Sequence, residues 1–178
     1  MIFRFKMKSD EVEDFERIID IDPDASFLEL HQAILAATGY KENINISFFL
    51  CDDDWEKEKE VCIVDRGSSY EEDVWLMKET PLNELIDDEE QRLIYVFDPE
   101  NERSIFIELA RIITGKSVEG PICVAESGKA PNQVLKEEIV KTAATSIDLD
   151  ADFYGDKSYN TEDLSNADIH DDLIDLQP

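Results

Sequence analysis

The segment from Arg92 to Ile113 constrains the fold more than any other part of this chain, because it has the pattern of two β-strands joined by one polar turn. Apolar and aromatic residues fill positions 93–97, Asp98-Pro99-Glu100-Asn101 interrupts them, and a second such run extends from Ile105 to Ile113. Turn-forming residues between two runs of this kind predict a β-hairpin. Apolar residues on both faces of Leu93–Phe97 predict a central strand, paired on both edges and covered on one face by a helix.

The first forty residues predict a hairpin followed by a helix. Ile2–Lys8 alternates apolar and basic residues, as a strand with one wet face does, and Phe15–Ile21 predicts the strand that pairs with it. Ser26 and Glu29 have the spacing of a capping box, in which each side chain satisfies a free backbone N–H group. With Gly39 as the stop, we expect a helix over 26–38 that lies across the sheet.

Shorter elements follow before the hairpin. Residues 43–51 and 61–64 predict two strands, and 74–77 fits either a strand or a helix. Thr80-Pro81 has the cap residue and first-turn proline of a short helix. The resulting order predicts an α+β domain, a mixed β-sheet with one main helix packed across it in a β-grasp-like order.

The part after the hairpin divides into a covering region and a tail. We expect 122–131 to be an irregular covering segment and 131–145 to be a C-terminal helix, which completes a single domain over 1–146 with its core in 1–113. Residues 147–178 contain ten acids and one lysine, a charge of −9, and we expect them to be a disordered or loosely docked acidic tail.

Charge limits the partners that the chain can have. Forty-four acids against 17 bases give a formal net charge of −27, and subtracting the −9 of the tail leaves −18 on residues 1–146. This charge disfavours direct binding of nucleic acid and favours basic protein partners. There is neither an apolar run long enough to span a membrane nor the apolar block of a signal peptide, so we expect a soluble cytoplasmic protein without a membrane partner.

The cysteines predict no cross-link. Cys51, Cys62 and Cys123 are widely spaced and odd in number, and we interpret them as reduced, partly buried thiols. Cys51 and Cys62 could face each other across neighbouring strands, but a disulfide would be the exception in the cytosol.

Local motifs give no catalytic or metal-binding constellation. Residues 110–117 match the loosest form of a phosphate-binding loop, but Arg111-Ile112-Ile113-Thr114 favours a strand over an open loop. Residues 148–159 begin like a calcium loop and lack its glycine and its final glutamate. His31 fits a satisfied, half-buried side chain beside the apolar helix face, and His170 lies in the tail. We therefore expect no enzyme, no cofactor and no metal.

Several segments together resemble the plasmid pRiA4b ORF-3-like family, many of whose members are uncharacterised or associated with mobile elements. The resemblance covers roughly residues 1–133 and rests on 15–19, 28–34, 38–40, 95–98, 121–123 and 128–131. After Asp98 the family tends to have Phe-Gly-Asp and Trp-x-His, where this chain has Pro99-Glu100-Asn101 and Arg103-Ser104-Ile105. The resemblance implies a small α+β fold and no established activity.

These observations predict a non-enzymatic protein–protein interaction module. The alternative is an acidic decoy that mimics nucleic acid and binds a basic DNA- or RNA-binding protein. The partner would be an unidentified protein, basic in the decoy case. The candidate partner-binding residues lie in the hairpin turn and on one helical face of the tail: Asp98, Glu100, Arg103, Ile169, Leu173 and Leu176.

Overall fold

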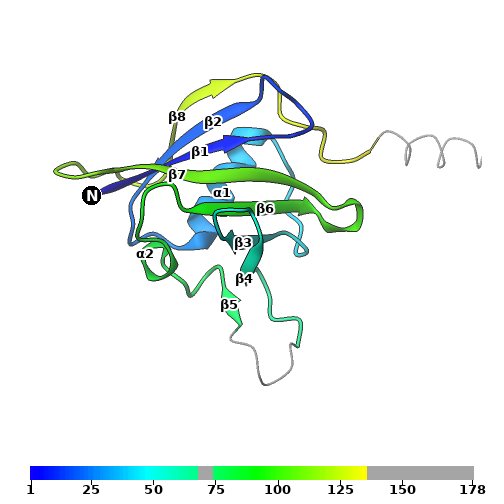
Figure 1. The fold of residues 1–178 in the computed structure, drawn as a ribbon, viewed down its shortest axis with the longest axis horizontal. Helices are drawn as coiled ribbons and strands as arrows, with labels where there is room; N and C mark the ends of the chain where they lie inside the picture. Colours follow the sequence, from blue (N-terminus) through cyan, green and yellow to red (C-terminus); the bar gives the residue numbers. More distant parts are fainter. Residues whose placement is uncertain (68–73, 136–178) are drawn as a thin grey trace, which may run out of the picture. The chain divides into compact units, whose positions relative to one another are not determined.

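The computed structural model describes residues 1–67 and 74–135, which contain one mixed sheet of eight strands and two α-helices. The strands follow the order β5-β4-β3-β6-β7-β1-β2-β8, and all neighbours are antiparallel except β4 and β5 (Figure 1). The elements in chain order are β1 (Ile2–Lys8), β2 (Glu16–Ile21), α1 (Phe27–Thr38), β3 (Ser47–Cys51), β4 (Lys57–Cys62), β5 (Trp75–Leu76), α2 (Leu82–Leu85), β6 (Arg92–Asp98), a 3₁₀ turn (Pro99–Asn101), β7 (Arg103–Ile113) and β8 (Ile122–Ser127).

The predicted central hairpin is confirmed. β6 pairs with β7 on one edge and β3 on the other, and both pairings are antiparallel. Leu93, Tyr95 and Phe97 point into the main core, while Ile94 and Val96 point to the opposite face of the sheet. A strand that is apolar on both faces therefore lies at the centre, as its sequence predicts.

Helix α1 begins and ends where the sequence indicates. The Ser26 hydroxyl accepts from the Glu29 backbone N–H, and the Glu29 carboxylate accepts from the Ser26 backbone N–H at 2.8 Å. Gly39 ends the helix with φ of 75°. The buried stripe of α1 covers one face of the sheet, seen behind the strands in Figure 1. The α+β class is thus confirmed.

The β-grasp-like order stays a prediction. β7 lies between β1 and β6 in the middle of the sheet. β4 begins earlier than the predicted strand at 61–64, and the ambiguous stretch 74–77 contains the two-residue strand β5. Pro81 is the N-cap of α2 instead of its first helical residue.

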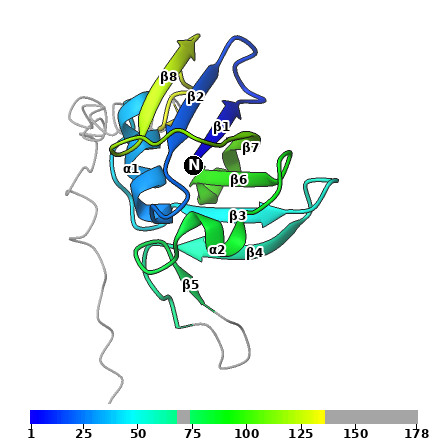
Figure 2. The same cartoon turned by 90° about the vertical axis from the view of Figure 1, so that its left-hand side faces the viewer.

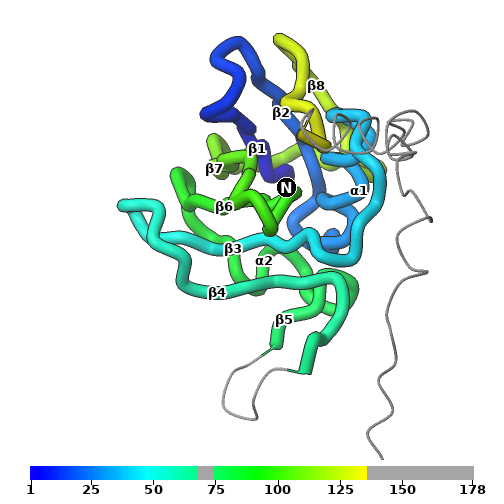
Figure 3. Tube along the Cα trace, turned by 90° about the vertical axis from the view of Figure 1, so that its right-hand side faces the viewer, coloured from blue at the N-terminus to red at the C-terminus, as the bar shows by residue number. Residues whose placement is uncertain are grey.

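The prediction of an irregular covering segment at 122–131 was wrong, because β8 pairs with β2 along Ile122–Ser127 and forms one edge of the sheet (Figure 3). β8 is exposed along its whole length, so it lacks the alternation of buried and exposed residues by which strands are recognised. Residues 131–135 are not helical. The rest of the predicted helix and the acidic tail lie outside the described residues.

A close contact after β8 joins this edge to the β1–β2 connection. Gly128 has φ of +62°, and a Cβ placed on it would lie 2.3 Å from the carbonyl oxygen of Asp14. Arg17, which is 7% exposed, donates to the carbonyl oxygens of Ser127, Gly128 and Ala37. Only glycine permits this approach of two backbones, and the buried guanidinium then connects β8 with the end of α1.

The two motif-like segments differ in what the structure describes. Residues 110–113 of the segment that resembles a phosphate-binding loop are the end of β7, residues 114–117 follow the strand, and no helix begins among the described residues up to 121. Residues 148–159, which begin like a calcium loop, lie outside the described residues. Neither helix within residues 1–67 and 74–135 has the length and hydropathy of a membrane span.

Candidate interaction surface

The face of the sheet opposite α1, which we call the open face, holds a second apolar cluster. Cys51, Ile94 and Val96 are buried there, although no other element of the described chain packs over them as α1 does on the far side. The partly buried rings of Phe49, Trp55 and Phe106 pack around them. The β3–β4 hairpin, whose tip carries Trp55, extends away from α1 in Figure 2.

Strand register explains why Phe49 and Phe106 lie on either side of Ile94. Phe49 of β3 is opposite Ile94 of β6, and Ile94 is opposite Phe106 of β7, so the three side chains form a row across the sheet. Side chains directly opposite on neighbouring strands are in contact distance. The centre of the open face is therefore an apolar row built from three strands.

Trp55 joins this row from the β3–β4 turn. The Asp52 carboxylate accepts from the backbone N–H groups of Asp54 and Glu56, each at 2.9 Å, and the turn places Trp55 at φ of 66°. The Trp55 ring then meets Phe106 edge-on, with ring centroids 5.0 Å apart. A bulky residue in the left-handed region is strained, and strain of this kind concentrates at functional sites.

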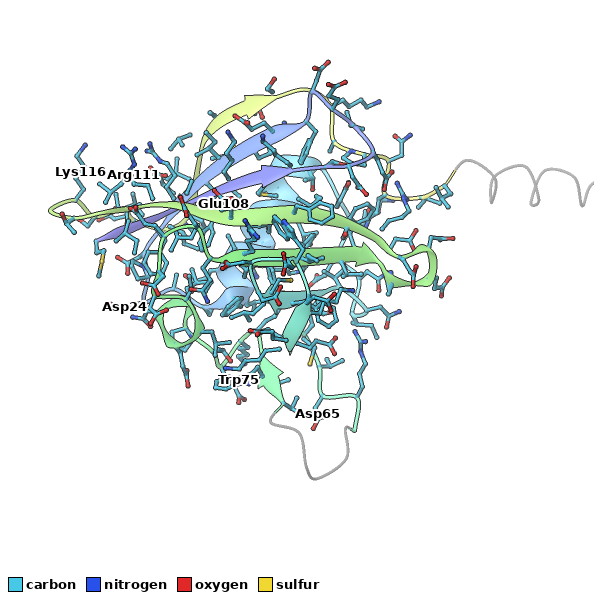
Figure 4. All side chains as sticks on the ribbon, in the orientation of Figure 1. Asp24, Asp65, Trp75, Glu108, Arg111 and Lys116 are labelled. Carbon is cyan, nitrogen blue, oxygen red and sulfur yellow. The ribbon has the colours of Figure 1, made fainter. Side chains whose placement is uncertain are left out.

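Charged groups surround the apolar row. The next row of the open face runs through Lys57, Cys51, Arg92, Glu108 and Lys6 on five neighbouring strands. Figure 4 labels Glu108, the member of this row that β7 contributes. The surface thus combines an apolar centre with a polar rim, which is the usual anatomy of a protein–protein interface.

Arg4 and Asp20 form the main ion pair of the open face. Arg4 donates to both carboxylate oxygens of Asp20 at 2.7 Å, and Asp20 is 5% exposed. These hydrogen bonds raise the pKa of Arg4. Lys6 similarly holds Glu16 at 3.0 Å. The β1–β2 part of the face is therefore fixed by paired charges.

The described part of the sheet carries hollows on its surface, of which three bear on the open face. One of about 190 Å³ on the open face is lined by Lys6, Lys8, Trp55, Phe106 and Glu108. A second, of about 490 Å³, includes Phe49, Lys57 and Val96 of the same face. A third, of about 870 Å³, is lined mainly by acids of the loop 87–90 together with Asp53 and Arg92. In residues 1–67 and 74–135, no group of three or more His, Cys, Asp or Glu side chains is placed to hold a metal ion.

The predicted turn residues lie near each other, but two of the three already have partners within the domain. Arg103 donates to both carboxylate oxygens of Glu11 at 2.9 and 2.8 Å and to the carbonyl oxygens of Asn132 and Gln133. Asp98 accepts from the Asn101 side chain at 2.9 Å and lies 3.5 Å from Arg103.

Glu100 is exposed, and Ile169, Leu173 and Leu176 lie outside the described residues. The assignment of all six residues to partner binding stays a prediction. The contacts of Arg103 identify it as the anchor of the segment that follows β8.

His31 is fully buried, which corrects the expected half-buried position. Its Nδ1 lies 3.0 Å from the Tyr95 hydroxyl oxygen, while its Nε2 has no hydrogen-bond partner among the described residues. Burial lowers the pKa of His31 and raises that of Tyr95. A neutral imidazole shut inside the core has no access to a substrate and supports the packing of α1 on β6.

The two inner cysteines do not face each other. Cys51 is opposite Lys57 and Cys62 is opposite Ser47, so they lie at opposite ends of the β3–β4 pair. Both are buried, and burial raises the pKa of each thiol. Cys123 is exposed on β8, and all three are free thiols.

Sequence reasoning missed Phe49, Trp55 and Phe106 as a joint surface. Its one available signal was that Phe49 falls on the opposite side of its strand from Ile46 and Phe48. The row depends on register between strands that are about fifty residues apart in the chain, and residue spacing does not specify register.

Comparisons with known proteins add the family and a fold relative. A crystal structure of a protein of unknown function from Methanosarcina mazei Go1 matches with a TM-score of 0.57 and 18% identity, covering 80% of this chain and 81% of that one. At this identity the match shows a shared fold. Among curated proteins nothing matches. The family model for plasmid pRiA4b ORF-3-like proteins matches residues 2–138, and the chain therefore belongs to this family.

Proposed function

We propose that this protein is a non-enzymatic protein-interaction module that binds its partner with the open face of the sheet. The observation that carries the proposal is the apolar row of Phe49, Ile94 and Phe106, with Trp55 beside it, on a face that α1 does not cover. Partly buried aromatic side chains at the centre of a polar rim are typical of residues that dominate binding energy.

The positions of the chemically versatile side chains also support a binding role. His31 is enclosed in the core, Asp20 is paired with Arg4, and Arg103 uses its donors on Glu11 and on backbone carbonyls. These groups hold elements together, while the rings of the open face have surface left to contact another molecule. A binding module needs such a surface and no reactive group.

Affinity capture with surface variants tests the proposal. Trp55→Gly removes one ring and suits the positive φ of the turn, and Phe106→Gln replaces the second ring with a polar group. Val124→Gln is the matched control, because Val124 is 46% exposed on the distant strand β8. Thermal unfolding first checks that all variants are folded.

The expected result is one or more proteins retained by the wild type and by Val124→Gln and lost from both ring variants. Retention of the same proteins by all four forms would overturn the assignment to the open face. Retention lost in all three variants would show a nonspecific effect of substitution and would also count against it.

The acidic decoy remains a second candidate, supported by the hollow whose lining includes Asp53, Asp87, Asp88, Glu89 and Glu90. Clustered carboxylates attract basic surfaces in a salt-dependent manner. We expect a decoy to retain a basic DNA-binding protein at low ionic strength and to release it to duplex DNA.

Amide substitutions test whether this cluster is responsible. Changing Asp53, Asp88 and Glu90 to their amides should weaken retention more than the same charge change at the exposed Glu13, Glu58 and Glu119. Glu89 is left intact because it accepts from the Ile112 backbone N–H at 2.7 Å. Equal weakening by both sets would contradict a localised decoy surface.

A further inference from the structure

The two edges of the described sheet differ in length. β5 ends the sheet with two residues, whereas β8 ends it with the six residues Ile122–Ser127 (Figure 2). Apart from the ladder with β2, two backbone groups of β8 have hydrogen bonds within the described residues: the Ser127 carbonyl accepts from Arg17, and the Ala125 carbonyl accepts from the Cys123 thiol. In an antiparallel pair, every second residue directs its N–H and C=O groups away from the neighbour. The outer edge of β8 therefore presents backbone groups that another extended strand can pair with.

β8 is held in place without burying a side chain. All six of its residues are exposed, including Ile122 at 47% and Val124 at 46%. Its position depends on the ladder with β2 and on the buried Arg17, which donates to the Ser127 and Gly128 carbonyl oxygens at 2.7 and 3.1 Å. A strand that adds no side chain to the core, yet is fixed by a buried guanidinium, contributes a preorganised edge. Preorganisation lowers the entropy cost of binding there.

The side chains of β8 give this edge little protection against pairing. Lysine and proline commonly block edge strands, but residues 122–127 contain neither, and Glu126 is their one charged residue. A single bulge at Val124, between the partners of Ile18 and Ile19, interrupts the ladder with β2. The edge is therefore nearly uncharged and carries two large apolar side chains, although the chain as a whole is strongly acidic.

An antiparallel copy of β8 fits the charges at the two ends of the strand. Glu119 precedes β8 and Lys129 follows it, and both residues are exposed. In an antiparallel pair centred on Val124, Lys129 of each copy approaches the partner's Glu119, and Glu126 lies opposite the partner's Ile122. A parallel pair would bring like charges together at both ends. Identical strands related by a two-fold axis are thus complementary to each other.

We infer that two copies of this chain pair through β8, edge to edge and antiparallel, and so join their eight-stranded sheets. Hydrogen bonds between the two backbones and contacts among the Ile122 and Val124 side chains supply the affinity. The net charge of −27 opposes the association of two copies, so salt that screens this charge should strengthen the dimer. The apolar row of the open face lies on β3, β6 and β7, and the inference is independent of the function proposed for it.

Sedimentation equilibrium of the full chain at about 0.15 M salt tests the inference. The wild type should reach twice the mass of the 20.4 kDa chain. Val124→Lys places two ammonium groups at the two-fold axis and should raise the dissociation constant of the dimer at least about tenfold. Val64→Lys is the matched control, since Val64 is 41% exposed just after β4, and it should leave the dimer unchanged. Phe106→Gln, on the open face, should also leave it unchanged.

Exchange of the end charges tests the antiparallel arrangement without altering β8 itself. Lys129→Glu replaces two attractive contacts with two repulsive ones and should weaken the dimer about five- to tenfold, and Glu119→Lys should do the same. The double variant, Lys129→Glu with Glu119→Lys, should regain the wild-type affinity, because the exchanged charges attract each other again across the two-fold axis. The two residues lie at opposite ends of β8 within one copy, so this recovery requires a second copy.

Three results would overturn the inference. A wild-type chain that stays monomeric at about 0.1 mM has no dimer of useful affinity. A dimer that Val124→Lys leaves intact, or that Phe106→Gln dissociates, uses a surface other than the β8 edge. A double charge variant that stays as weak as the single variants contradicts the antiparallel pairing of the two strands.

Discussion

Alanine at Gly128 should detach the last described strand from the rest of the sheet. The added Cβ would lie 2.3 Å from the carbonyl oxygen and 2.5 Å from the carbonyl carbon of Asp14, and 2.9 Å from the backbone nitrogen of Phe15. These are backbone atoms that no side-chain rotation can move. Arg17 holds the carbonyl oxygen of Gly128 at 3.1 Å, so the segment has little freedom to shift away.

The loss of stability expected for Gly128→Ala has two parts. The left-handed conformation, φ of +62°, costs a residue with a side chain about 1–2 kcal/mol. The backbone clash adds to this cost, and we expect a total loss of about 3 kcal/mol or more in the free energy of unfolding. For a chain of 178 residues, this loss corresponds to a fall in Tm of about 6–12 °C.

Gly120→Ala is the matched control. Gly120 has φ of +77°, but a Cβ on it would meet nothing within 4 Å. Gly120→Ala should therefore lower the free energy of unfolding only by the cost of the left-handed conformation, about 1–2 kcal/mol. Thermal unfolding followed by circular dichroism measures both variants, and hydrogen exchange of the β8 amides locates the damage. Equal losses in the two variants would refute the role of the Asp14 contact.

Three further predictions concern titration, anchoring and thiol exposure. Because burial lowers the pKa of His31, the folded protein holds its imidazole neutral, so the free energy of unfolding should keep its full value above about pH 6.5 and fall as the pH drops below that value. His31→Leu should reduce this part of the pH dependence of Tm. An unchanged slope of Tm against pH would contradict the role of His31. Arg103→Met should lower the free energy of unfolding by about 2 kcal/mol through lost hydrogen bonds, against about 0.5 kcal/mol or less for the exposed Arg111→Met in urea denaturation. A thiol reagent followed by mass spectrometry should label Cys123 in the folded protein and reach Cys51 and Cys62 only after unfolding, and equally fast labelling of all three would refute their burial.

Local patterns were sufficient where the chain makes local contacts. The capping box and Gly39 define α1 within one residue, because both caps act on backbone groups only a few residues away. The hairpin of β6 and β7 was equally predictable, since its turn and both strands are contiguous in the sequence.

Elements that depend on distant contacts were not predictable in the same way. β8 owes its conformation to pairing with β2 and to the contact of Gly128 with Asp14, both more than one hundred residues apart in sequence. Its six residues are all exposed, so no periodic pattern marks them as a strand. The role of Arg103 was missed for the same reason, because its acceptors at Asn132 and Gln133 follow β8.

The candidate surface was the least predictable feature. Phe49 and Phe106 are each one aromatic residue within an ordinary strand, and only the strand register places them on either side of Ile94. Trp55 adds a further requirement, a turn in the left-handed region that residue preferences disfavour. A surface assembled from three strands and a strained turn becomes visible only when the sheet is complete.

The position of β8 has a consequence for synthesis on the ribosome. β2 ends at Ile21 and its second partner begins at Ile122, so 100 residues, 22–121, must be added before the β2 edge is covered. At about 5–20 residues per second, this takes about 5–20 s. During that time the nascent chain presents an open strand edge containing Ile18 and Ile19, a template for unwanted pairing with other chains. The last described strand thus sets how long the β2 edge stays open in the growing chain.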